Sequence, residues 1–506
     1  MLSSRPVNGI AGYLLLSVIV MVAYRLLVID LTPVHLFFDE AYYLSWAQTP
    51  DWGYYSKPPM VAWVIWLTTT LLGDAEWAVK AGAAMLYGLT ALLVADTGRL
   101  LFDRRTGVFA GFILLLMPLV SFNSLFITTD APLLFFWALA IRLFLQAESS
   151  NGLIWWCLAG LAGGLGLLSK YTFILLPVSF LLLAVFCERG RALLRTPGFW
   201  LACALATACL LPNLYWNYRH DFISFQHTAE ISHQGENPVS LTRLLEFWLG
   251  QAAVFGPLLA LTLVSALRCR KGVSRCDGER FAWALFWPTF IVISAQALLA
   301  RANINWAAPA YIGGALVVAY HLSHTTRRWW PPLALGVNLL LALIFYHYVF
   351  ILNLAGIEPG RHSNPYKRVM GWPALVAQLQ PEFDSRPDIP LASDSRRLLA
   401  YFGYYLSPHR YQGYALNRDG HIDDHYELMR SIDRDSPQRL LFVSQHLGTE
   451  ALLRYFDHVE KIATAHVDIF DDFSRNAQLY LVTGYRDGEA NMASDQEVRN
   501  AHAKTP

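Results

Sequence analysis

Charged residues are scarce in this chain, and their scarcity argues against an ordinary soluble protein. Only 15% of the 506 residues are Asp, Glu, Lys or Arg, while 55% are hydrophobic. Average soluble domains carry roughly 25% charged residues. The formal net charge is +1, and no basic face is concentrated in the carboxy-terminal part of the sequence. The sequence therefore predicts no nucleic-acid partner.

Cysteine is also rare, and none follows residue 276. The six cysteines are Cys157, Cys187, Cys203, Cys209, Cys269 and Cys276. Cys269 and Cys276 are too isolated to form a four-ligand zinc site, and we interpret all six as small apolar fillers and loop thiols. The sequence predicts no metal site and firmly implies no cofactor; a divalent metal stays an open alternative without support from the residues.

Long apolar runs, in contrast, fill the chain up to about residue 355. A membrane-spanning helix needs about 20 apolar residues, and the first run, Ile10 to Ile29, is too long for a signal-peptide core. We predict a mostly α fold, a polytopic helix bundle of about eleven spans with a range of eleven to thirteen. The predicted spans are approximately 8–29, 76–101, 107–122, 127–146, 152–169, 171–187, 198–217, 244–267, 281–300, 305–322 and 331–354. Residues 58–73 begin with two prolines and are predicted to form an interfacial helix in the first outer loop.

Beyond residue 356 the charges return, and we predict three domains: a membrane domain over 1–355, an extracytoplasmic α/β domain over 356–486, and a disordered tail over 487–506. Leu440 to Val443 and Gln478 to Val482 have strand character, whereas Trp372 to Leu379 and Thr449 to Phe456 have helix character. The pairs Asp423-Asp424 and Asp471-Asp472 are interpreted as solvated loop acids. Two roles stay open for this domain, admission of an acceptor and simple stabilisation.

Basic residues alternate between two sets of loops. One set carries the clusters Arg104-Arg105, Arg189 to Arg195, Arg268 to Arg280 and Arg327-Arg328. The other set carries only the single residues Lys57, Arg219, Arg243 and Arg301. The positive-inside rule places the first set and the amino terminus in the cytoplasm. The carboxy-terminal domain is then outside, which in a bacterium is the periplasm.

Charges on the outer side are not needed to orient the chain, so each is a functional candidate. Asp39-Glu40 follows the first span, and its alternative interpretation is a helix cap or a surface acid. Lys57 projects from the rigid Ser56-Lys57-Pro58-Pro59 turn. Its alternative is a lysine that reaches lipid phosphates from the interface.

Further polar residues are predicted on the same side. Asp130 is either a site carboxylate or an amino-terminal helix cap. The loop Arg219-His220-Asp221 either orders around a ligand or is an ordinary polar loop. Lys170 is either a lipid-phosphate contact or a sign that the number of spans is wrong.

The segment Arg301 to Trp306 completes this outer set. Arg301 can pair with a phosphate and Trp306 can pack on a sugar ring. The alternative is an aromatic-belt tryptophan beside an interfacial arginine.

These segments, in this order, resemble the dolichyl-phosphate-mannose-protein mannosyltransferase-like superfamily. It comprises polytopic glycosyltransferases of the C-type fold, including the bacterial lipid A aminoarabinose transferase and the lipopolysaccharide galacturonosyl transferases. The resemblance covers roughly residues 35 to 320. It rests on Phe38-Asp39-Glu40-Ala41-Tyr42-Tyr43, Tyr55-Ser56-Lys57-Pro58-Pro59, Thr129-Asp130-Ala131-Pro132, the stretch Trp216 to Phe225, and Asn305-Trp306-Ala307-Ala308-Pro309-Ala310-Tyr311.

The resemblance implies transfer of a sugar from a polyprenyl phosphate to a lipid, glycan or protein acceptor at the outer face of the cytoplasmic membrane. The implied partners are that donor, that acceptor and the membrane lipids. The implied catalytic residues are Asp39, Glu40 and Asp130, and those implied to bind the donor phosphate are Lys57, Arg219 and Arg301. The implied substrate contacts are Tyr42, Tyr43, Tyr55, His220, Asp221, Asn305 and Trp306. The alternative function is a polytopic transporter or lipid flippase, for which we expect paired inverted repeats and ionisable residues near mid-membrane; the sequence shows no such repeat.

Overall fold

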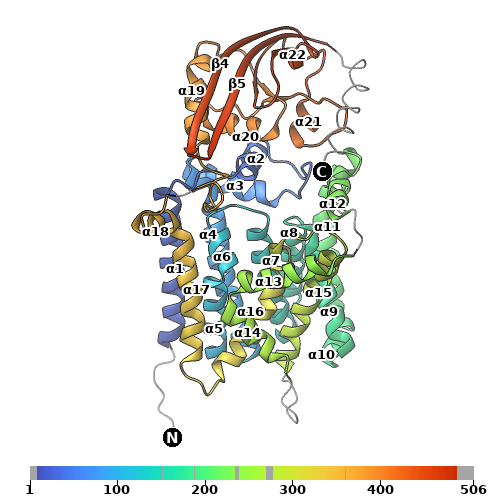
Figure 1. Ribbon diagram of the computed structural model, residues 1–506. Helices are drawn as coiled ribbons and strands as arrows, with labels where there is room; N and C mark the ends of the chain where they lie inside the picture. Colours follow the sequence, from blue (N-terminus) through green and yellow to red (C-terminus); the bar gives the residue numbers. More distant parts are fainter. Residues whose placement is uncertain are drawn as a thin grey trace. The chain divides into compact units, whose positions relative to one another are not determined.

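A computed structural model describes residues 8–150, 152–186, 188–233, 239–268, 277–358 and 360–486. The chain divides into two compact units (Figure 1). The first unit comprises Met1–Thr32 and Lys57–Ile351, and the second comprises Pro33–Ser56 and Leu352–Pro506. Cys187, Cys269, Cys276 and the predicted disordered tail 487–506 lie outside the described residues.

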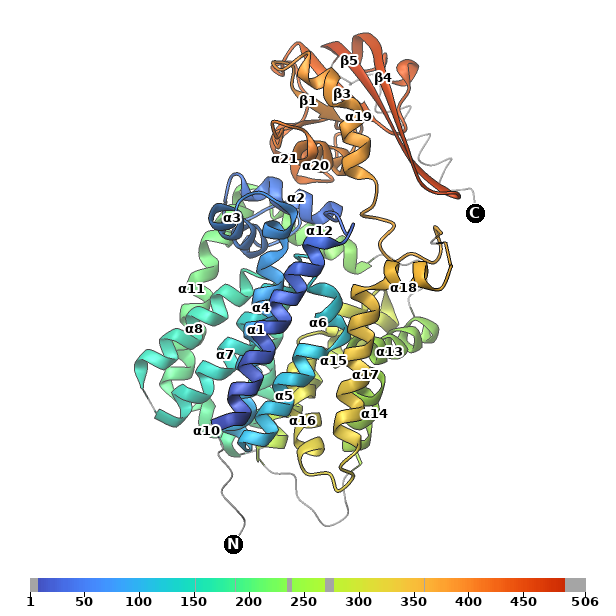
Figure 2. The same cartoon turned by 90° about the vertical axis from the view of Figure 1, so that its left-hand side faces the viewer.

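The first unit consists of helices. They are α1 (Asn8–Leu31), α3 (Met60–Leu72), α4 (Glu76–Leu101), α5 (Arg104–Leu116), α6 (Pro118–Asn123), α7 (Asp130–Ser150), α8 (Leu153–Leu167), η1 (Tyr171–Ile174), α9 (Leu175–Phe186), α10 (Glu188–Leu194), α11 (Pro197–Arg219), α12 (Ile223–His233), α13 (Leu241–Phe255), α14 (Pro257–Ala266), α15 (Asp277–Leu299), η2 (Ile304–Ala307), α16 (Ala310–Ser323), α17 (Trp330–Tyr346) and α18 (Tyr348–Leu354). Apolar sequence adopts helix in a membrane because a helix satisfies its own backbone hydrogen bonds. Figure 2 shows these helices as a bundle.

Within the described residues each predicted span lies mostly in helix, but the predicted number of spans is not confirmed. In the described part of the chain, five helices are long and apolar enough to cross a membrane: α1, α4, α7, α11 and α15. The bent pairs α13–α14 (111°) and α17–α18 (80°) raise the number to seven if each pair is one span. The other predicted spans are shorter apolar helices or, at Met117, a helix interrupted before Pro118.

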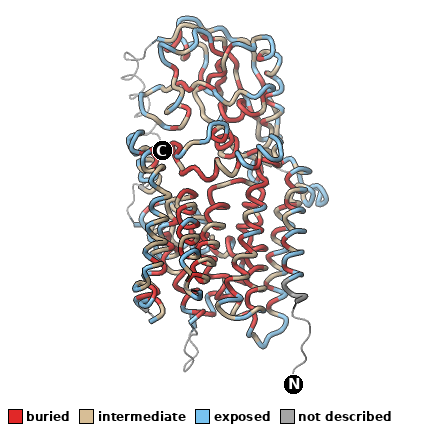
Figure 3. Tube along the Cα trace, turned by 180° about the vertical axis from the view of Figure 1, so that it is seen from behind, coloured by how far each residue is buried: buried red, intermediate tan, exposed pale blue. Residues whose placement is uncertain are grey.

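Glycine permits both the bend and the close packing of this unit. Gly256, between α13 and α14, has φ +99, and a Cβ there would lie 2.0 Å from Asn338 Oδ1. Gly107 of α5 packs so closely on α4 that a Cβ would lie 2.4 Å from the Ala95 carbonyl oxygen. Small residues of this kind let helix backbones approach each other where apolar burial alone cannot drive association. Figure 3 shows the resulting buried turns along the helices.

The second unit contains a five-stranded sheet in the order β2-β1-β3-β5-β4. The strands are β1 (Leu391–Ser393), β2 (Tyr414–Ala415), β3 (Arg439–Ser444), β4 (Phe456–Phe470) and β5 (Phe473–Tyr485). β1 pairs in parallel with β2 and β3, whereas β5 pairs antiparallel with both β3 and β4. The helices are α2 (Phe38–Ala47), α19 (Trp372–Asp384), α20 (Arg396–Tyr405), α21 (His425–Arg430) and α22 (Thr449–Leu452).

The secondary structure predicted here is confirmed except at one segment. The two predicted strands lie in β3 and β5, and the helix predicted from Trp372 is α19. The helix predicted over Thr449 to Phe456 ends at Leu452, and Phe456 instead opens β4. Phe456 is 1% exposed in a cluster with Phe442 and Val482, so tertiary packing in the sheet outweighs the local helical pattern.

Pro33–Ser56 follows the first helix in sequence but packs with the carboxy-terminal residues. Its helix α2 contacts α20, and its Trp46 and Tyr54 rings stack on each other at 4.6 Å. Both rings also contact His425, at 5.6 and 5.2 Å between centroids. We predicted this segment as part of the membrane domain over 1–355. The structure instead places it in the same compact unit as the carboxy-terminal residues.

Candidate functional site

Asp130 is the centre of a buried polar network in the first unit. Its carboxylate opens α7 and is 3% exposed. Lys170 Nζ lies 2.9 Å from Asp130 Oδ1, and Asn305 Nδ2 donates a hydrogen bond to Asp130 Oδ2. A buried carboxylate is costly unless it is paired and hydrogen-bonded, and both conditions are met here. The network joins side chains from α7, from the residue before η1 and from η2.

This arrangement answers the question left open for Lys170, whose side chain is 19% exposed. Its ammonium forms an ion pair with a carboxylate of its own chain, so neither sequence interpretation describes its main contact. Pairing could not be read from the sequence because 40 residues separate the partners. The helix-cap interpretation of Asp130 accounts for its position but not for its two side-chain partners.

The remaining predicted cations and loop residues of this unit have different surroundings. Arg219 is exposed and donates to Tyr215 Oη at 3.4 Å. His220 stacks on Trp216 at 4.1 Å and bonds through Nδ1 to the Trp216 carbonyl oxygen. Asp221 has φ +51, a left-handed backbone conformation at the turn after α11. These contacts favour an ordered turn in place of a loop that awaits a ligand.

Trp306 and Arg301 lie near η2. Trp306 packs against a buried cluster that includes Phe247 and Ala307, while Asn305 points its amide to Asp130. Arg301 is exposed, and Lys57, the first residue of the unit's second segment, is half-buried. The structure thus brings Asp130 and Asn305 into direct contact, and the roles of the two cations stay predictions.

The acidic pair Asp39-Glu40 lies in the first turn of α2, in the second unit. Glu40 is 1% exposed, and its Oε2 accepts a hydrogen bond from the Phe37 backbone N–H at 2.8 Å. This bond satisfies a donor at the helix start, as the cap interpretation predicted. Asp39 is half-buried. The catalytic role predicted for either residue stays a prediction.

The predicted substrate-binding tyrosines of this region are interior residues. Tyr42, Tyr43 and Tyr55 are 2%, 6% and 2% exposed. Tyr42 Oη accepts a hydrogen bond from the His425 backbone N–H, and its ring lies 5.5 Å from that of Tyr426. Burial raises the pKa of Tyr42 well above its usual value, and the Asp424 charge adds to the shift. Packing of α2 against α21 is the role these contacts support.

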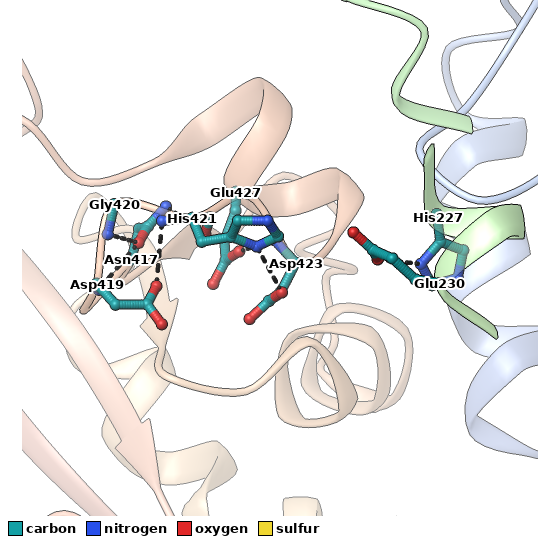
Figure 4. Close-up of polar contacts among 8 residues, drawn as sticks. All are labelled: His227, Glu230, Asn417, Asp419, Gly420, His421, Asp423 and Glu427. Carbon is teal, nitrogen blue, oxygen red and sulfur yellow. Dashed lines mark hydrogen bonds and ion pairs between the residues drawn. The ribbon is translucent and has the colours of Figure 1, made fainter. Parts of the chain in front are cut away.

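The loop before α21 contains an acidic group that Figure 4 shows in detail. Asp424 caps α21 by accepting from the Tyr426 and Glu427 N–H groups, and the Asp423 N–H donates to Glu427 Oε2 at 2.6 Å. His421 Nδ1 lies 2.9 Å from Asp423 Oδ1. Figure 4 also draws His227, whose Nδ1 lies 3.9 Å from Glu230 Oε2 in α12. Among the residues with a described placement, no group of three His, Cys, Asp or Glu side chains is arranged to hold a metal ion.

Glu427 predicts a pH dependence of stability. Burial raises the pKa of its carboxyl to about 7, and the charges of Asp424 and Asp423 act in the same direction. The folded protein then binds a proton that the unfolded chain releases near pH 4.5, so stability falls as pH rises between these values. We expect the Tm of Glu427→Gln to fall less than that of wild type between pH 5 and pH 8. Glu450→Gln, at an exposed position of α22, is the matched control; an identical fall in both variants would contradict the assignment.

Comparison with known proteins connects this geometry to a family. A family model described as dolichyl-phosphate-mannose-protein mannosyltransferase matches residues 56–216. Lipid A galacturonosyltransferase RgtD of Rhizobium johnstonii is 29% identical over 442 residues, which are 85% of this chain and 90% of that protein.

Solved structures share the fold. The crystal structure of ArnT from Cupriavidus metallidurans in the apo state has a TM-score of 0.64 at 16% identity, over 92% of this chain and 97% of that one. ArnT from the same organism bound to undecaprenyl phosphate has a TM-score of 0.62 at 17% identity, over 91% and 97% of the two chains.

Three independent results therefore agree: the motifs of the sequence, the helical bundle with a small carboxy-terminal sheet, and relatives that are named as glycosyltransferases. They do not favour a transporter. The chain is a multi-pass membrane glycosyltransferase that is similar to the dolichyl-phosphate-mannose-protein mannosyltransferase family and to bacterial lipid A galacturonosyltransferases, and it shares the fold of ArnT.

Proposed function

We propose that this enzyme transfers a sugar from a polyprenyl phosphate to a glycolipid of the lipid A class at the outer face of the cytoplasmic membrane. Galacturonic acid is the first sugar to test, because RgtD is named as a lipid A galacturonosyltransferase. The donor class is supported by the ArnT structure that holds undecaprenyl phosphate. The outward orientation is supported by the alternation of basic loops in the sequence.

The observation that carries the proposal is the Asp130 network. The hydrogen bond from the Asn305 side-chain amide to the Asp130 carboxylate connects two of the motifs on which the family resemblance rests, and Lys170 forms an ion pair with the same carboxylate. These motifs lie 175 residues apart in the chain. Burying a carboxylate and its cation costs desolvation free energy. The presence of this ion pair in the membrane domain therefore supports a role in function.

In the proposed reaction Asp39 is the general base. The acceptor hydroxyl oxygen forms a bond to the anomeric carbon as the bond from that carbon to the phosphate oxygen breaks. The hydroxyl proton passes to the Asp39 carboxylate, and the polyprenyl phosphate leaves with the bonding electron pair. A single displacement of this kind inverts the configuration at the anomeric carbon.

Lys57 is proposed to stabilise the charge that develops on the leaving phosphate. Arg219 and Arg301 are proposed as additional phosphate contacts, which their exposure permits. The proposal retains a membrane domain over residues 1–355 and an extracytoplasmic domain over 356–486.

The direct test uses purified wild-type protein in liposomes with a panel of polyprenyl-phosphate sugars and purified lipid A. We expect mass spectrometry to detect glycosylated lipid A with one member of the panel and none with the corresponding nucleotide sugar. Transfer from the nucleotide sugar would contradict the donor class. Transfer to peptide or free glycan but not to lipid A would contradict the acceptor class.

A second measurement tests the role of Lys57. Charge-assisted hydrogen bonds contribute about 1.5–3 kcal/mol each, so Lys57→Met is expected to lower kcat/KM for the donor by about tenfold or more. Lys461→Met, at an exposed position of β4, is the matched control and should behave as wild type. An unchanged donor dependence in Lys57→Met would remove this residue from the phosphate site.

A further inference from the structure

The second unit contains a cavity of 770 Å³ whose walls are strongly basic. Its cationic lining residues are Arg361, Lys367, Arg368, Arg397 and Arg475, and His446 adds an imidazole. The described residues that line it include no Asp or Glu. From the sequence we expected no basic face in this part of the chain. That expectation was wrong, because the cations come from separate segments that only the fold brings together.

Three of these arginines have their guanidinium groups over aromatic rings instead of beside carboxylates. The Arg361 guanidinium lies 5.5 Å from the Phe473 ring centroid, Arg397 lies 5.4 Å from that of Phe38, and Arg475 lies 4.2 Å from that of Trp372. In the described part of the chain, none of the three forms an ion pair with a carboxylate. A guanidinium over a ring face is attracted to the ring, and those of its N–H groups that have no other partner can donate to an anion.

Arg475 is the most constrained of these cations. It is 7% exposed, and it donates from Nε to the Met370 carbonyl and from Nη2 to the carbonyls of Lys367 and Arg368. Among the described residues its Nη1 has no hydrogen-bond partner. Burial lowers the pKa of Arg475 to about 10, and the neighbouring Arg397 charge contributes in the same direction. Because the lining residues of this cavity include several cations and no Asp or Glu, the cavity favours binding of an anion from outside the chain.

The cavity also adjoins the predicted catalytic residue within the same unit. Phe37 and Phe38, which directly precede Asp39, are lining residues, and so is Tyr401. Burial raises the pKa of Tyr401, and the charges of Glu40 and Asp39 act on the same hydroxyl. Outside the lining, Asp472 Oδ1 accepts a hydrogen bond from the Arg361 backbone N–H at 3.0 Å.

We propose that this cavity binds a phosphorylated sugar of the acceptor and so presents the acceptor hydroxyl to Asp39. Its volume falls within the range of about 300–1,000 Å³ typical of small-molecule sites. The cations supply bidentate phosphate contacts, and the aromatic rings at the cavity supply apolar surface beside a sugar ring. This inference rests on the proposed function and specifies its acceptor as an anionic glycolipid.

The test compares the full-length wild-type enzyme with the double variant Arg361→Gln/Arg397→Gln, in which both changed side chains are exposed. Diphosphorylated and enzymatically dephosphorylated lipid A are the two acceptors. For wild type we expect the acceptor KM to be about tenfold or more higher without phosphate. For the double variant we expect a similarly high KM with both acceptors. Arg439→Gln, an exposed position at the start of β3, should retain the preference of wild type.

Three outcomes separate the inference from the function on which it rests. If wild type makes no product from any donor and acceptor, the proposed function fails. If wild type transfers the sugar and the double variant keeps the phosphate preference, the function stands and the cavity assignment is overturned. If the double variant instead raises only the donor KM, the cavity binds the polyprenyl phosphate and the acceptor assignment is likewise overturned. Direct binding of diphosphorylated lipid A, weakened in the double variant and not in Arg439→Gln, is the readout that does not depend on turnover.

Discussion

Asp39→Asn is expected to reduce sugar transfer by about 10²–10⁴-fold, the usual contribution of a general base. The amide has the shape of the carboxylate but cannot accept the proton of the acceptor hydroxyl. Because Asp39 is half-buried at the start of α2 and its neighbour Glu40 makes the cap hydrogen bond, the variant should fold as wild type does. The measurement is kcat for transfer to lipid A in liposomes, together with the Tm of each protein.

Two matched variants make this result specific. Asp435→Asn changes an exposed aspartate of the same unit and should leave kcat unchanged. Glu40→Gln should mainly lower the Tm, since the Glu40 carboxylate accepts from the Phe37 N–H and is 1% exposed. If Glu40→Gln lost activity at unchanged Tm while Asp39→Asn remained active, the catalytic carboxylate would be Glu40.

Lys170→Met is expected to destabilise the membrane domain by about 3–5 kcal/mol, because it leaves the Asp130 carboxylate buried without its cation. The Asp130 side chain is 3% exposed, and Lys170 Nζ lies 2.9 Å from its Oδ1. Unfolding titrated with a denaturing detergent provides the measurement. The surface pair Arg486–Asp457 has side chains 54% and 53% exposed, so Arg486→Met should change stability by about 1 kcal/mol or less.

The double variant Asp130→Asn/Lys170→Met distinguishes pairing from packing. It removes both charges and keeps similar side-chain volumes, so it should be more stable than Lys170→Met alone. A double variant as unstable as the sum of the two single variants would show that the two side chains act independently. Asn305 then has an amide as neighbour in place of a carboxylate, and transfer activity should stay below that of wild type.

The sequence by itself determined the helices of the apolar part of the chain and indicated the class of enzyme. Apolar runs specify helices because lipid offers backbone groups no other partner. The bend between α13 and α14 was not predicted, since 244–267 was taken as one span, and Gly256 is required there because a side chain would collide with Asn338. The strands β3 and β5 follow from β-branched and aromatic residues in short runs. The motifs around Asp39, Lys57, Asp130 and Asn305 were sufficient to predict a glycosyltransferase.

Only the tertiary structure decided which of those residues have partners and which are interior. Lys170 pairs with Asp130 and Tyr42 accepts a hydrogen bond from the His425 N–H, although nothing near these residues in sequence indicates either partner. The basic cavity is formed from segments around residues 361–368, 397 and 475. The physical reason is common to all of these cases. Burial and charge pairing depend on distances between segments that are remote in sequence, whereas helix and strand formation depend on neighbours along the chain.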